Sequence, residues 1–368
     1  MTSPLASVLD LFSSFVGCCI PSSNLSINGK AYRIVKLLGE GGFSFVYLAQ
    51  DGSGNLYAMK KIRCTLGTEE AELAQKEVDI YQLFSHPNVI RMLDSSTITE
   101  SDGSKTIYIF LPYYKRGNLQ DVINKNNLNK THFTEADMLR IFRQVCIAVQ
   151  YLHTYKAKGG ARVMYEPSQV MSAEEENRQD EALLNGHQEQ PSGEQIETGK
   201  RGEIVPWAHR DIKPGNVLMS DDGETPILMD FGSACPARVS IETRQDALRQ
   251  QDLAAEQSTM PYRAPELFDV KTGTTLDEKV DIWSLGCTLY AMAYGSSPFE
   301  VNMDQGGSVA LAVLNNQYKF PQDSPYSSEL NEVISWMLTA NPANRPNIHQ
   351  IISKLDQLLE TYQNTTEA

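Results

Sequence analysis

Hydrophobic and polar positions along the chain follow two different periods, which predict strands in some segments and helices in others. Apolar and polar residues alternate through 32–61 around a glycine-rich stretch, a pattern typical of two strands joined by a turn. A further β-rich run covers 107–111. Apolar residues recur at helical spacing through 135–155, and 69–84 is a second helical run. The sequence therefore predicts strands early in the chain and a long helix with an apolar face after them.

Residues 1–20 have an apolar pattern of their own, with hydrophobic residues at helical spacing and polar residues, including Asp10, toward the other face. This pattern predicts a short amphipathic helix. Cys18 and Cys19 lie beside it, and we expect both to be S-palmitoylated. Two acyl chains anchor a protein stably, because each buried methylene contributes about 0.8 kcal/mol and one chain alone is marginal. A helix packed on the protein body is the alternative, and a signal peptide is a third reading that lacks a basic first part.

Composition limits the classes of partner. The chain has 368 residues, of which 41% are hydrophobic, enough for one large core or two joined ones. The formal net charge of −14 argues against a nucleic-acid partner and against electrostatic binding to anionic lipid, so membrane binding would have to be apolar. The six cysteines have no disulfide-like or C-x-x-C spacing, which fits a reducing compartment. No stretch reaches the roughly 18 apolar residues of a membrane-spanning helix.

Three short motifs follow one another in the second half of the chain. His209-Arg210-Asp211 opens a polar stretch that ends at Asn216, and Asp230-Phe231-Gly232 and Ala264-Pro265-Glu266 come after it. The order H-R-D, D-F-G, A-P-E is the signature of protein kinases. Lys213-Pro214 is more similar to the Ser/Thr branch than to the tyrosine branch. The chain therefore resembles the eukaryotic Ser/Thr protein kinases over about residues 30–360.

The resemblance implies an α+β fold of two lobes, a small β-rich N-lobe and a larger helical C-lobe. The expected boundaries are 30–111 for the N-lobe, 112–118 for the hinge and 119–360 for the C-lobe, with an N-terminal segment 1–29 and a tail 361–368. Residues 156–205 interrupt the C-lobe, where a kinase normally needs only a few residues. They are acidic, rich in Glu, Gln, Gly and Ser and poor in aromatic residues, which predicts a disordered surface insertion. A docking or regulatory arm is the alternative.

The resemblance also implies an ATP site. Glycines let backbone N–H groups approach the phosphates without a Cβ in the way, although Ser44 replaces the third glycine of the family pattern. Lys60 would reach the α- and β-phosphates and pair with Glu77, whereas Lys61 alternates to the opposite face of its strand. The nucleotide-binding residues implied in the two lobes and the hinge are Gly39, Gly41, Gly42, Val46, Ala58, Lys60, Leu111 as gatekeeper, Pro112 and Tyr114 toward the adenine, and Asn118 or Asp121 toward the ribose.

Phosphoryl transfer needs positioning and neutralisation of charge more than covalent help. In the family pattern Asp211 would accept the proton of the substrate hydroxyl, and Lys213 would steady the transferred phosphoryl group. Asn216 and Asp230 would hold Mg²⁺ through hard oxygen ligands. The expected cofactors are therefore ATP and Mg²⁺, and the expected partners are proteins with Ser or Thr acceptors.

The stretch 233–259 resembles an activation segment. Four of its hydroxyl residues could carry phosphate, and Arg210 is the kind of partner that a phosphorylated loop needs. The interior 246–256 is alternately charged and rich in Leu and Ala, which favours a local helix that orders the segment without phosphate. Control by phosphorylation and constitutive activity therefore both stay open. The hydroxyl residues are Ser240, Thr243, Ser258 and Thr259. The family pattern also implies that Thr259 contacts Asp211.

Further along the chain, the family pattern implies two structural contacts. Glu266 is expected to pair with Arg345, and Asp281 is expected to hold the catalytic loop through its backbone N–H groups. Gly-Glu-Gly-Gly-Phe-Ser in 39–44, the hinge sequence 111–119 and Asp-Phe-Gly-Ser look like the Numb-associated kinase family. The resemblance is nearest to its acylated single-domain members, including fungal ones at the vacuole membrane.

This finer resemblance implies an autophosphorylating kinase in vacuolar or endomembrane trafficking or fusion, on the cytoplasmic face of the vacuole or lysosome or of the Golgi. It leaves the oligomeric state open. A membrane-bound pseudokinase scaffold is the main alternative, against which the presence of Lys60, Glu77 and Asp211 argues. A small-molecule kinase of related fold is a third reading, against which the A-P-E motif argues.

Overall fold

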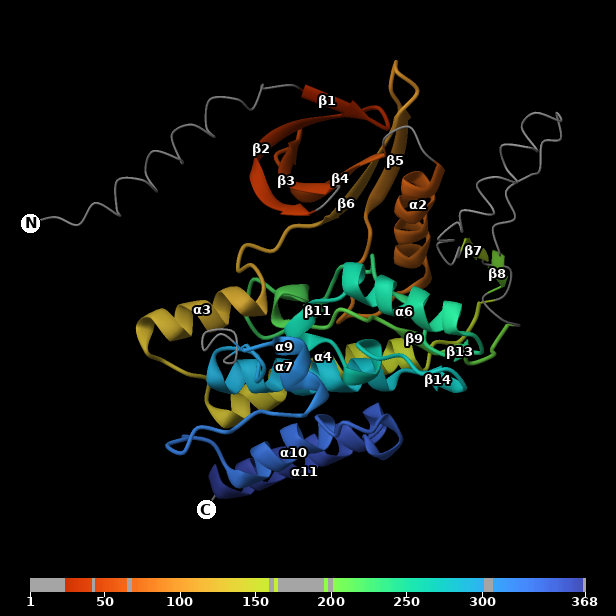
Figure 1. The fold of residues 1–368 in the computed structure, drawn as a ribbon. Coiled ribbons are helices and arrows are strands. Elements are labelled where there is room, and N and C mark those ends of the chain that lie inside the picture. The colour runs from red at the N-terminus through yellow and green to blue at the C-terminus, as the bar shows by residue number, and fades with distance from the viewer. Residues whose placement is uncertain are drawn as a thin grey trace, which may run out of the picture. The chain divides into compact units, whose positions relative to one another are not determined.

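The computed structural model describes residues 24–41, 44–64, 68–158, 162–164, 195–197, 201–300 and 307–366. They fall into two compact units (Figure 1). The first comprises the described residues of Met1–Val78 and Arg91–Tyr113, and the second those of Asp79–Ile90 and Tyr114–Ala368. Among the described helices, none is both long and apolar enough to cross a bilayer. Cys18, Cys19 and the expected helix of 1–20 lie outside the described residues.

The first unit is built on a curved, antiparallel, six-stranded sheet (Figure 1). Helix α2, Thr68–Leu83, follows the fourth strand along the chain. The strand order is β1-β2-β3-β4-β6-β5, with β1 Asn24–Ile27, β2 Lys30–Gly41, β3 Ser44–Asp51, β4 Leu56–Cys64, β5 Asp94–Thr99 and β6 Lys105–Pro112.

The sheet begins earlier than the sequence predicted. β1 belongs to the expected N-terminal segment 1–29, yet it pairs with β2 and buries Ile27 in the core of the sheet beside Tyr32 and Phe110. Asn28, in the turn after β1, donates from Nδ2 to Asp94 Oδ1 and to the backbone oxygen of Ser95 in β5, each at 3.1 Å. The first strand thus reaches the strand at the opposite end of the sheet order. This contact stabilises the curvature.

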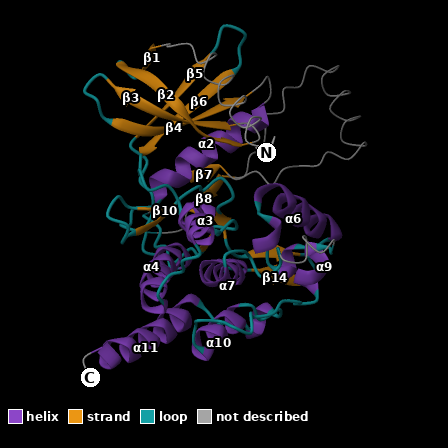
Figure 2. Ribbon diagram, turned by 90° about the vertical axis from the view of Figure 1, so that its left-hand side faces the viewer, coloured by secondary structure: helices purple, strands orange, loops and turns teal. Residues whose placement is uncertain are grey.

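The second unit is mainly helical (Figure 2). Most of its described strands form short two-stranded pairs that connect the helices. The helices are α3 Leu119–Asn129, α4 Glu135–His153, α6 Arg244–Gln257, α7 Lys279–Tyr294, α9 Val309–Leu314, α10 Ser328–Met337 and α11 Ile348–Thr366. The pairs are β9 Trp207–Ala208 with β12 Cys235–Pro236, β10 Val217–Met219 with β11 Pro226–Leu228, and β13 Val239–Ile241 with β14 Thr274–Leu276.

Helix α7 lies at the centre of this unit, packed against α4 and α10 (Figure 2). It is apolar nearly all round, which is typical of a helix buried on every side. Gly286 permits the close packing, because a Cβ there would lie 2.9 Å from Leu338 Cδ2 and 3.0 Å from Met337 Cβ. α4 buries the face that the sequence predicted, and its N-cap is Thr134. Helices α4 and α7 thus form the packed core against which the short strands and loops of the unit lie.

The predicted insertion has ordered ends. Within the described parts of 156–205, Arg162–Met164 (β7) pairs with Gln195–Glu197 (β8). Closer to the body, Lys156 forms an antiparallel bridge with Ile204. Backbone hydrogen bonds join Ala157 N to Glu203 O and Gly202 N to Ala157 O, both at 2.8 Å, and Val205 N to Tyr155 O at 2.9 Å. Composition alone did not indicate this pairing, since it depends on residues far apart in the sequence.

Candidate active site

One buried carboxylate holds the loop from His209 to Asn216. Asp281, in the first turn of α7, accepts from His209 N at 2.8 Å and from Arg210 N at 2.9 Å. The Nε2 atom of His153 lies 3.0 Å from the same carboxylate. Burial opposes the ionised form, but hydrogen bonding to His153 and the charges of His153 and His209 prevail and lower the pKa of Asp281. The predicted contact between Asp281 and the backbone of this loop is confirmed.

The Asp211 carboxylate is surrounded by three donors. Its Oδ1 accepts from Thr259 N at 2.8 Å. Its Oδ2 accepts from Asn216 Nδ2 at 3.0 Å and lies 2.8 Å from Lys213 Nζ. Lys213 also donates to Thr259 Oγ1 at 2.6 Å. The structure therefore brings together Asp211, Lys213 and Asn216, and the expected Thr259 contact to Asp211 is made by its backbone N–H.

Asn216 and Asp230 flank one hairpin, with Asn216 directly before β10 and Asp230 two residues after the end of β11. β10 and β11 pair Val217 with Leu228, so the residues just outside that pair face each other, and Met229 N donates to Asn216 O at 2.9 Å. Asp230 comes next in the chain and adopts a left-handed backbone conformation, with φ of +64°. Such a conformation is strained for a residue with a Cβ and is commonly kept at functional positions. The hairpin thus places both predicted metal ligands at the same end.

The oxygen of the Asn216 side chain is suited to a metal ion. Its Nδ2 donates to both the backbone oxygen and the carboxylate of Asp211, at 2.8 and 3.0 Å, which orients Oδ1 away from Asp211. An amide oxygen and a carboxylate are hard ligands of the kind that Mg²⁺ takes beside substrate phosphates. The donor set of Asn216 and Asp230 therefore fits a divalent cation. Across the described residues, no group of three or more His, Cys, Asp and Glu side chains is placed to hold a metal ion.

In the first unit, Lys60 on β4 pairs with Glu77 on α2. Lys60 Nζ donates to both carboxylate oxygens, at 2.7 and 2.9 Å. Both side chains are largely buried, with 15% and 7% of their surfaces exposed. A pair of this kind is fixed in geometry by its burial, unlike a solvated surface pair. The Lys60 ammonium is therefore held at one point of the sheet by the position of α2.

The glycine-rich stretch lies across the sheet from this lysine. The strand register aligns Gly39 of β2 with Val46 of β3, and Val46 with Lys60 of β4. A Cβ added at Gly39 would meet no atom within 4 Å, so the backbone there is open to a ligand. At Gly41 a Cβ would lie 3.0 Å from the Ser44 hydroxyl. Gly42, the third predicted glycine, lies outside the described residues.

The predicted hinge residues serve partly structural purposes. Leu111 is buried and pairs with Ala58 of β4. Burial raises the pKa of the Tyr114 phenol, with a smaller effect from Asp221. Asn118 forms the N-cap of α3, since its side chain accepts from Asp121 N at 3.0 Å and its own N–H donates to the Asp121 carboxylate. Pro112 ends β6, and the Asn118 side chain, expected at the ribose, is engaged in this capping box.

The activation segment contains the predicted local helix, α6. Thr243 caps it in a capping box with Asp246. Ser258 Oγ donates to Ala254 O at 2.6 Å and accepts from Arg263 Nε, and Thr259 Oγ1 accepts from Lys213. Ser240 is exposed on β13. Of the four hydroxyls, three thus have structural partners.

Helix α6 also supplies the contact of Arg210. Arg210 Nη1 donates to Gln250 Oε1 at 2.8 Å, and both side chains are buried. The Nε and Nη2 atoms of Arg210 are buried without a hydrogen-bond partner in the described structure. A neutral amide therefore occupies part of the place where the sequence predicted that a phosphate could bind.

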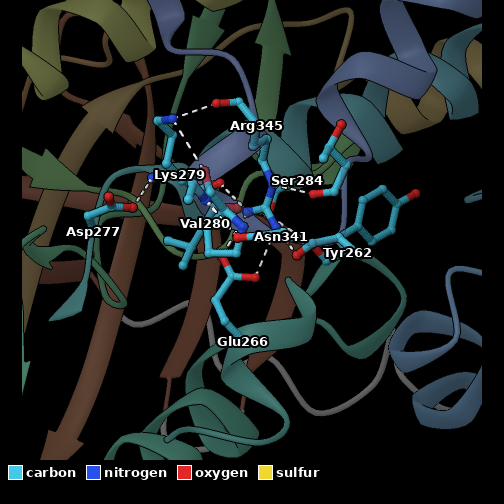
Figure 3. Close-up of polar contacts among 12 residues, drawn as sticks. Tyr262, Glu266, Asp277, Lys279, Val280, Ser284, Asn341 and Arg345 are labelled. Atoms are coloured by element: carbon cyan, nitrogen blue, oxygen red, sulfur yellow. Dashed lines mark hydrogen bonds and ion pairs between the residues drawn. The ribbon is translucent and has the colours of Figure 1, made fainter. Parts of the chain in front are cut away.

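An ion pair joins the A-P-E motif to the end of the domain (Figure 3). Arg345 donates from Nη1 and Nη2 to the two oxygens of Glu266, at 2.7 and 2.9 Å, as predicted. It also donates to the backbone oxygens of Thr339, Lys279 and Ala340. All the donor nitrogens of this buried guanidinium are thereby satisfied, a requirement for a stabilising buried charge.

Two residues contact Asp281 or the catalytic loop, although the sequence analysis did not identify either of them as functional. His153 was predicted to be structural, and it lies against Asp281. Gln250 was not singled out at all, and it contacts Arg210. Neither belongs to a short motif, so a local pattern could not have found them. The sequence offered only a weaker indication, because each is a polar residue at a helix position that faces the protein interior.

Comparison with known proteins identifies the family. The protein kinase domain matches residues 32–159 and 206–355. The chain is 38% identical to serine/threonine-protein kinase ppk13 of Schizosaccharomyces pombe, over 95% of this chain and 96% of the other. It is 37% identical to serine/threonine-protein kinase ENV7 of Saccharomyces cerevisiae, over 95% and 98%. It is 34% identical to serine/threonine-protein kinase 16 of Homo sapiens, over 93% and 94%. The predicted two-lobed α+β fold is thereby confirmed, and the chain belongs to the protein kinase family as a serine/threonine protein kinase.

Proposed function

We propose that this kinase is catalytically active and transfers the γ-phosphoryl group of ATP to Ser and Thr hydroxyls of proteins, its own included. The observation that carries the proposal is the arrangement at Asp211, whose carboxylate is held by Thr259, Asn216 and Lys213 within 3.0 Å. A pseudokinase scaffold would not need a carboxylate such as that of Asp211, in which both oxygens are held by hydrogen bonds or an ion pair. Family membership implies ATP and a divalent metal ion, and we propose Mg²⁺.

In the proposed reaction Asp211 accepts the proton of the substrate hydroxyl as that oxygen bonds to the γ-phosphorus. The bond from this phosphorus to the oxygen that bridges to the β-phosphate breaks, and ADP leaves. Lys213 stays beside the transferred group and balances its charge. Lys60, held by Glu77, binds phosphate oxygens of ATP. Each of these groups is charged and already paired, so little reorganisation is needed when the substrate binds.

Asn216 and Asp230 are the residues that would hold the metal ion. When bound, Mg²⁺ supplies positive charge to the phosphate oxygens and orients them. The contribution of the chain is the hairpin of β10 and β11, which fixes both residues at one end, and the Asp211 contact, which turns the Asn216 oxygen outward.

The test compares wild type with Asp211→Asn. We expect phosphoryl transfer to Ser and Thr to fall by about 10²–10⁴-fold, the usual contribution of a positioned general base. Stabilisation against heating by ATP and Mg²⁺ should persist, because the nucleotide does not need the base. Phosphoamino-acid analysis of radiolabelled product checks both the acceptor type and autophosphorylation.

An exposed aspartate provides the control, since Asp323→Asn removes the same charge from the surface and should leave transfer unchanged. Full activity of Asp211→Asn would show that another group is the base. A wild type that binds ATP without transferring phosphate would be the scaffold of the alternative reading.

We further propose that the kinase is anchored to the cytoplasmic face of an endomembrane, vacuolar or lysosomal or of the Golgi, through palmitoylated Cys18 and Cys19, and that it acts there in membrane trafficking or fusion. The adjacent cysteines and the apolar pattern of 1–20 support this proposal. The double change Cys18→Ser with Cys19→Ser should move the protein to the soluble fraction and leave kinase activity intact. Unchanged pelleting with membranes would refute acylation as the anchor.

A further inference from the structure

The base of the insertion contacts helix α2. The Nζ atom of Lys158 donates to the backbone oxygen of Leu83, the last residue of α2, at 3.2 Å. Lys158 follows the bridge between Lys156 and Ile204 and the two hydrogen bonds of Ala157. The backbone that carries this lysine is therefore fixed by pairing within the base of the insertion, residues 155–158 and 202–205.

The C-terminal end of α2 needs such a donor. The last carbonyls of a helix have no partner within the helix, and the aligned peptide dipoles make that end negative. The last turn of α2 contains no basic residue. The Tyr151 hydroxyl accepts from the backbone N–H of Ser85, a contact that satisfies no carbonyl of the helix. The Lys158 ammonium supplies positive charge to this helix end, and it comes from the insertion.

A second set of contacts leads from the same base to the loop of Asp230. Phe84 directly follows α2, and its ring lies 5.5 Å from that of Tyr155 and 5.7 Å from that of Trp207, which flank the base. The Phe84 ring also lies 5.3 Å from that of Phe231, the neighbour of Asp230. Tyr155, Trp207 and Phe231 are all buried. The base of the insertion thus packs into the cluster that positions Phe231.

We propose that Lys158 is a positioning residue for catalysis, which acts by fixing the end of α2 and, through this helix, Glu77 and the Lys60 ammonium. Glu77 lies in the same helix as Leu83, so a change in the end of α2 is transmitted along its rigid backbone to the ion pair. The insertion is then attached at a point where its base stabilises the catalytic machinery. The proposal rests on the proposed function, because its kinetic consequence is a change in ATP use.

The kinetic test compares two lysines of the same segment. Lys158→Met should lower kcat/KM for ATP about two- to tenfold, the range expected for a cation lost from a helix C-terminus. Lys158→Arg should restore most of this loss, because it retains the charge and a donor. Lys156→Met, two residues away and exposed like Lys158, is the matched control and should have no effect. An equal effect of Lys156→Met and Lys158→Met would overturn the proposal.

A double-mutant cycle separates positioning from general stability. If Lys158 acts through Glu77, then Lys158→Met should cost little in a Glu77→Gln background, because the ion pair that it positions is already weakened. Independent, additive losses in the two variants would overturn the proposal.

Hydrogen exchange of the nucleotide-free protein supplies a readout without catalysis. The backbone amides in the last turns of α2 should exchange about two- to tenfold faster in Lys158→Met, and at the wild-type rate in Lys156→Met. Unchanged exchange in Lys158→Met would overturn the proposal even if activity fell. A wild-type protein without phosphoryl transfer would refute the proposed function, whereas this exchange measurement would still decide whether Lys158 holds α2.

Discussion

At the scale of single residues, the loop of Asp211 depends on one carboxylate outside the loop. Asp281 holds two successive N–H groups, those of His209 and Arg210, and the second of these residues has a left-handed backbone with φ of +66°. A non-glycine residue keeps such a conformation only when its surroundings hold it there. The loop that carries Asp211, the proposed proton acceptor, is thus held by a residue outside the loop.

Replacing Asp281 by Asn should destabilise the fold and reduce catalysis. Removal of one charged partner from a buried network costs about 3–5 kcal/mol. The two N–H groups bond to different carboxylate oxygens, and an amide has one acceptor oxygen, so one N–H group would face an NH2 donor. Urea unfolding measures the loss, and phosphoryl transfer should fall with it. The exposed Asp323→Asn serves again as the control for both measurements.

The same carboxylate predicts a pH dependence. The folded-state pKa of Asp281 lies below its ordinary value of 3.8, so its ionised form stabilises the fold above that value. The contribution is lost as the pH falls through the lowered folded pKa. Unfolding measured from pH 7 down to strongly acidic pH should show a steeper acid loss in wild type than in Asp281→Asn. Parallel curves for the two proteins would contradict the assigned pKa direction.

At the scale of elements, helix α6 orders the activation segment from within. Its capping box of Thr243 and Asp246 satisfies the first turn, and Gln250 on its buried side reaches Arg210. Phosphate on the Thr243 hydroxyl would displace the Asp246 contact and bring two negative groups together. Helix α6 therefore favours constitutive activity over control by phosphorylation of Thr243.

We expect the enzyme to remain active after treatment with a phosphatase, because a neutral glutamine already contacts Arg210. Gln250→Ala should lower activity several-fold by leaving the buried Arg210 with less hydrogen bonding, at a cost of about 1–3 kcal/mol in stability. The exposed Gln245→Ala, on the same helix, is the matched control. Loss of activity on dephosphorylation of the wild type would instead support Ser240, the exposed hydroxyl, as a regulatory site.

At the scale of the whole molecule, contacts between distant parts of the chain close the helical unit. Arg345 reaches Glu266 across 79 positions of sequence (Figure 3). The pair connects the segment after the activation helix with the last helices of the chain. Since the guanidinium is fully buried and the pair is bidentate, we expect a large stabilising contribution.

Arg345→Met should lower the free energy of unfolding by about 3–5 kcal/mol, because Glu266 and three backbone oxygens lose their donor. Arg140→Met removes an exposed pair with Asp137 on one turn of α4 and should change stability by less than about 0.5 kcal/mol. Chemical denaturation of both variants gives the comparison. Similar losses in the two variants would mean that burial of the Arg345 pair contributes little.

The sequence by itself determined the family, the residues of the motifs and several of the strands and helices. It could do so because each motif packs its chemistry into a few consecutive residues, as in His209 to Asn216, and because helical and strand periods are local. It also predicted α6 from local propensity alone. The sequence did not predict β1, because a strand of four residues is too short to show a clear alternation of apolar and polar positions.

Only the tertiary structure decided which distant side chains complete the site. The contacts of Asp281 with His153, of Arg210 with Gln250 and of Lys158 with the end of α2 join residues that lie 128, 40 and 75 positions apart. No local pattern encodes such partners, because they depend on how helices pack and not on the spacing within any one of them. The chemistry of this kinase is thus set by short stretches of sequence, and its positioning is set by the packing of the fold.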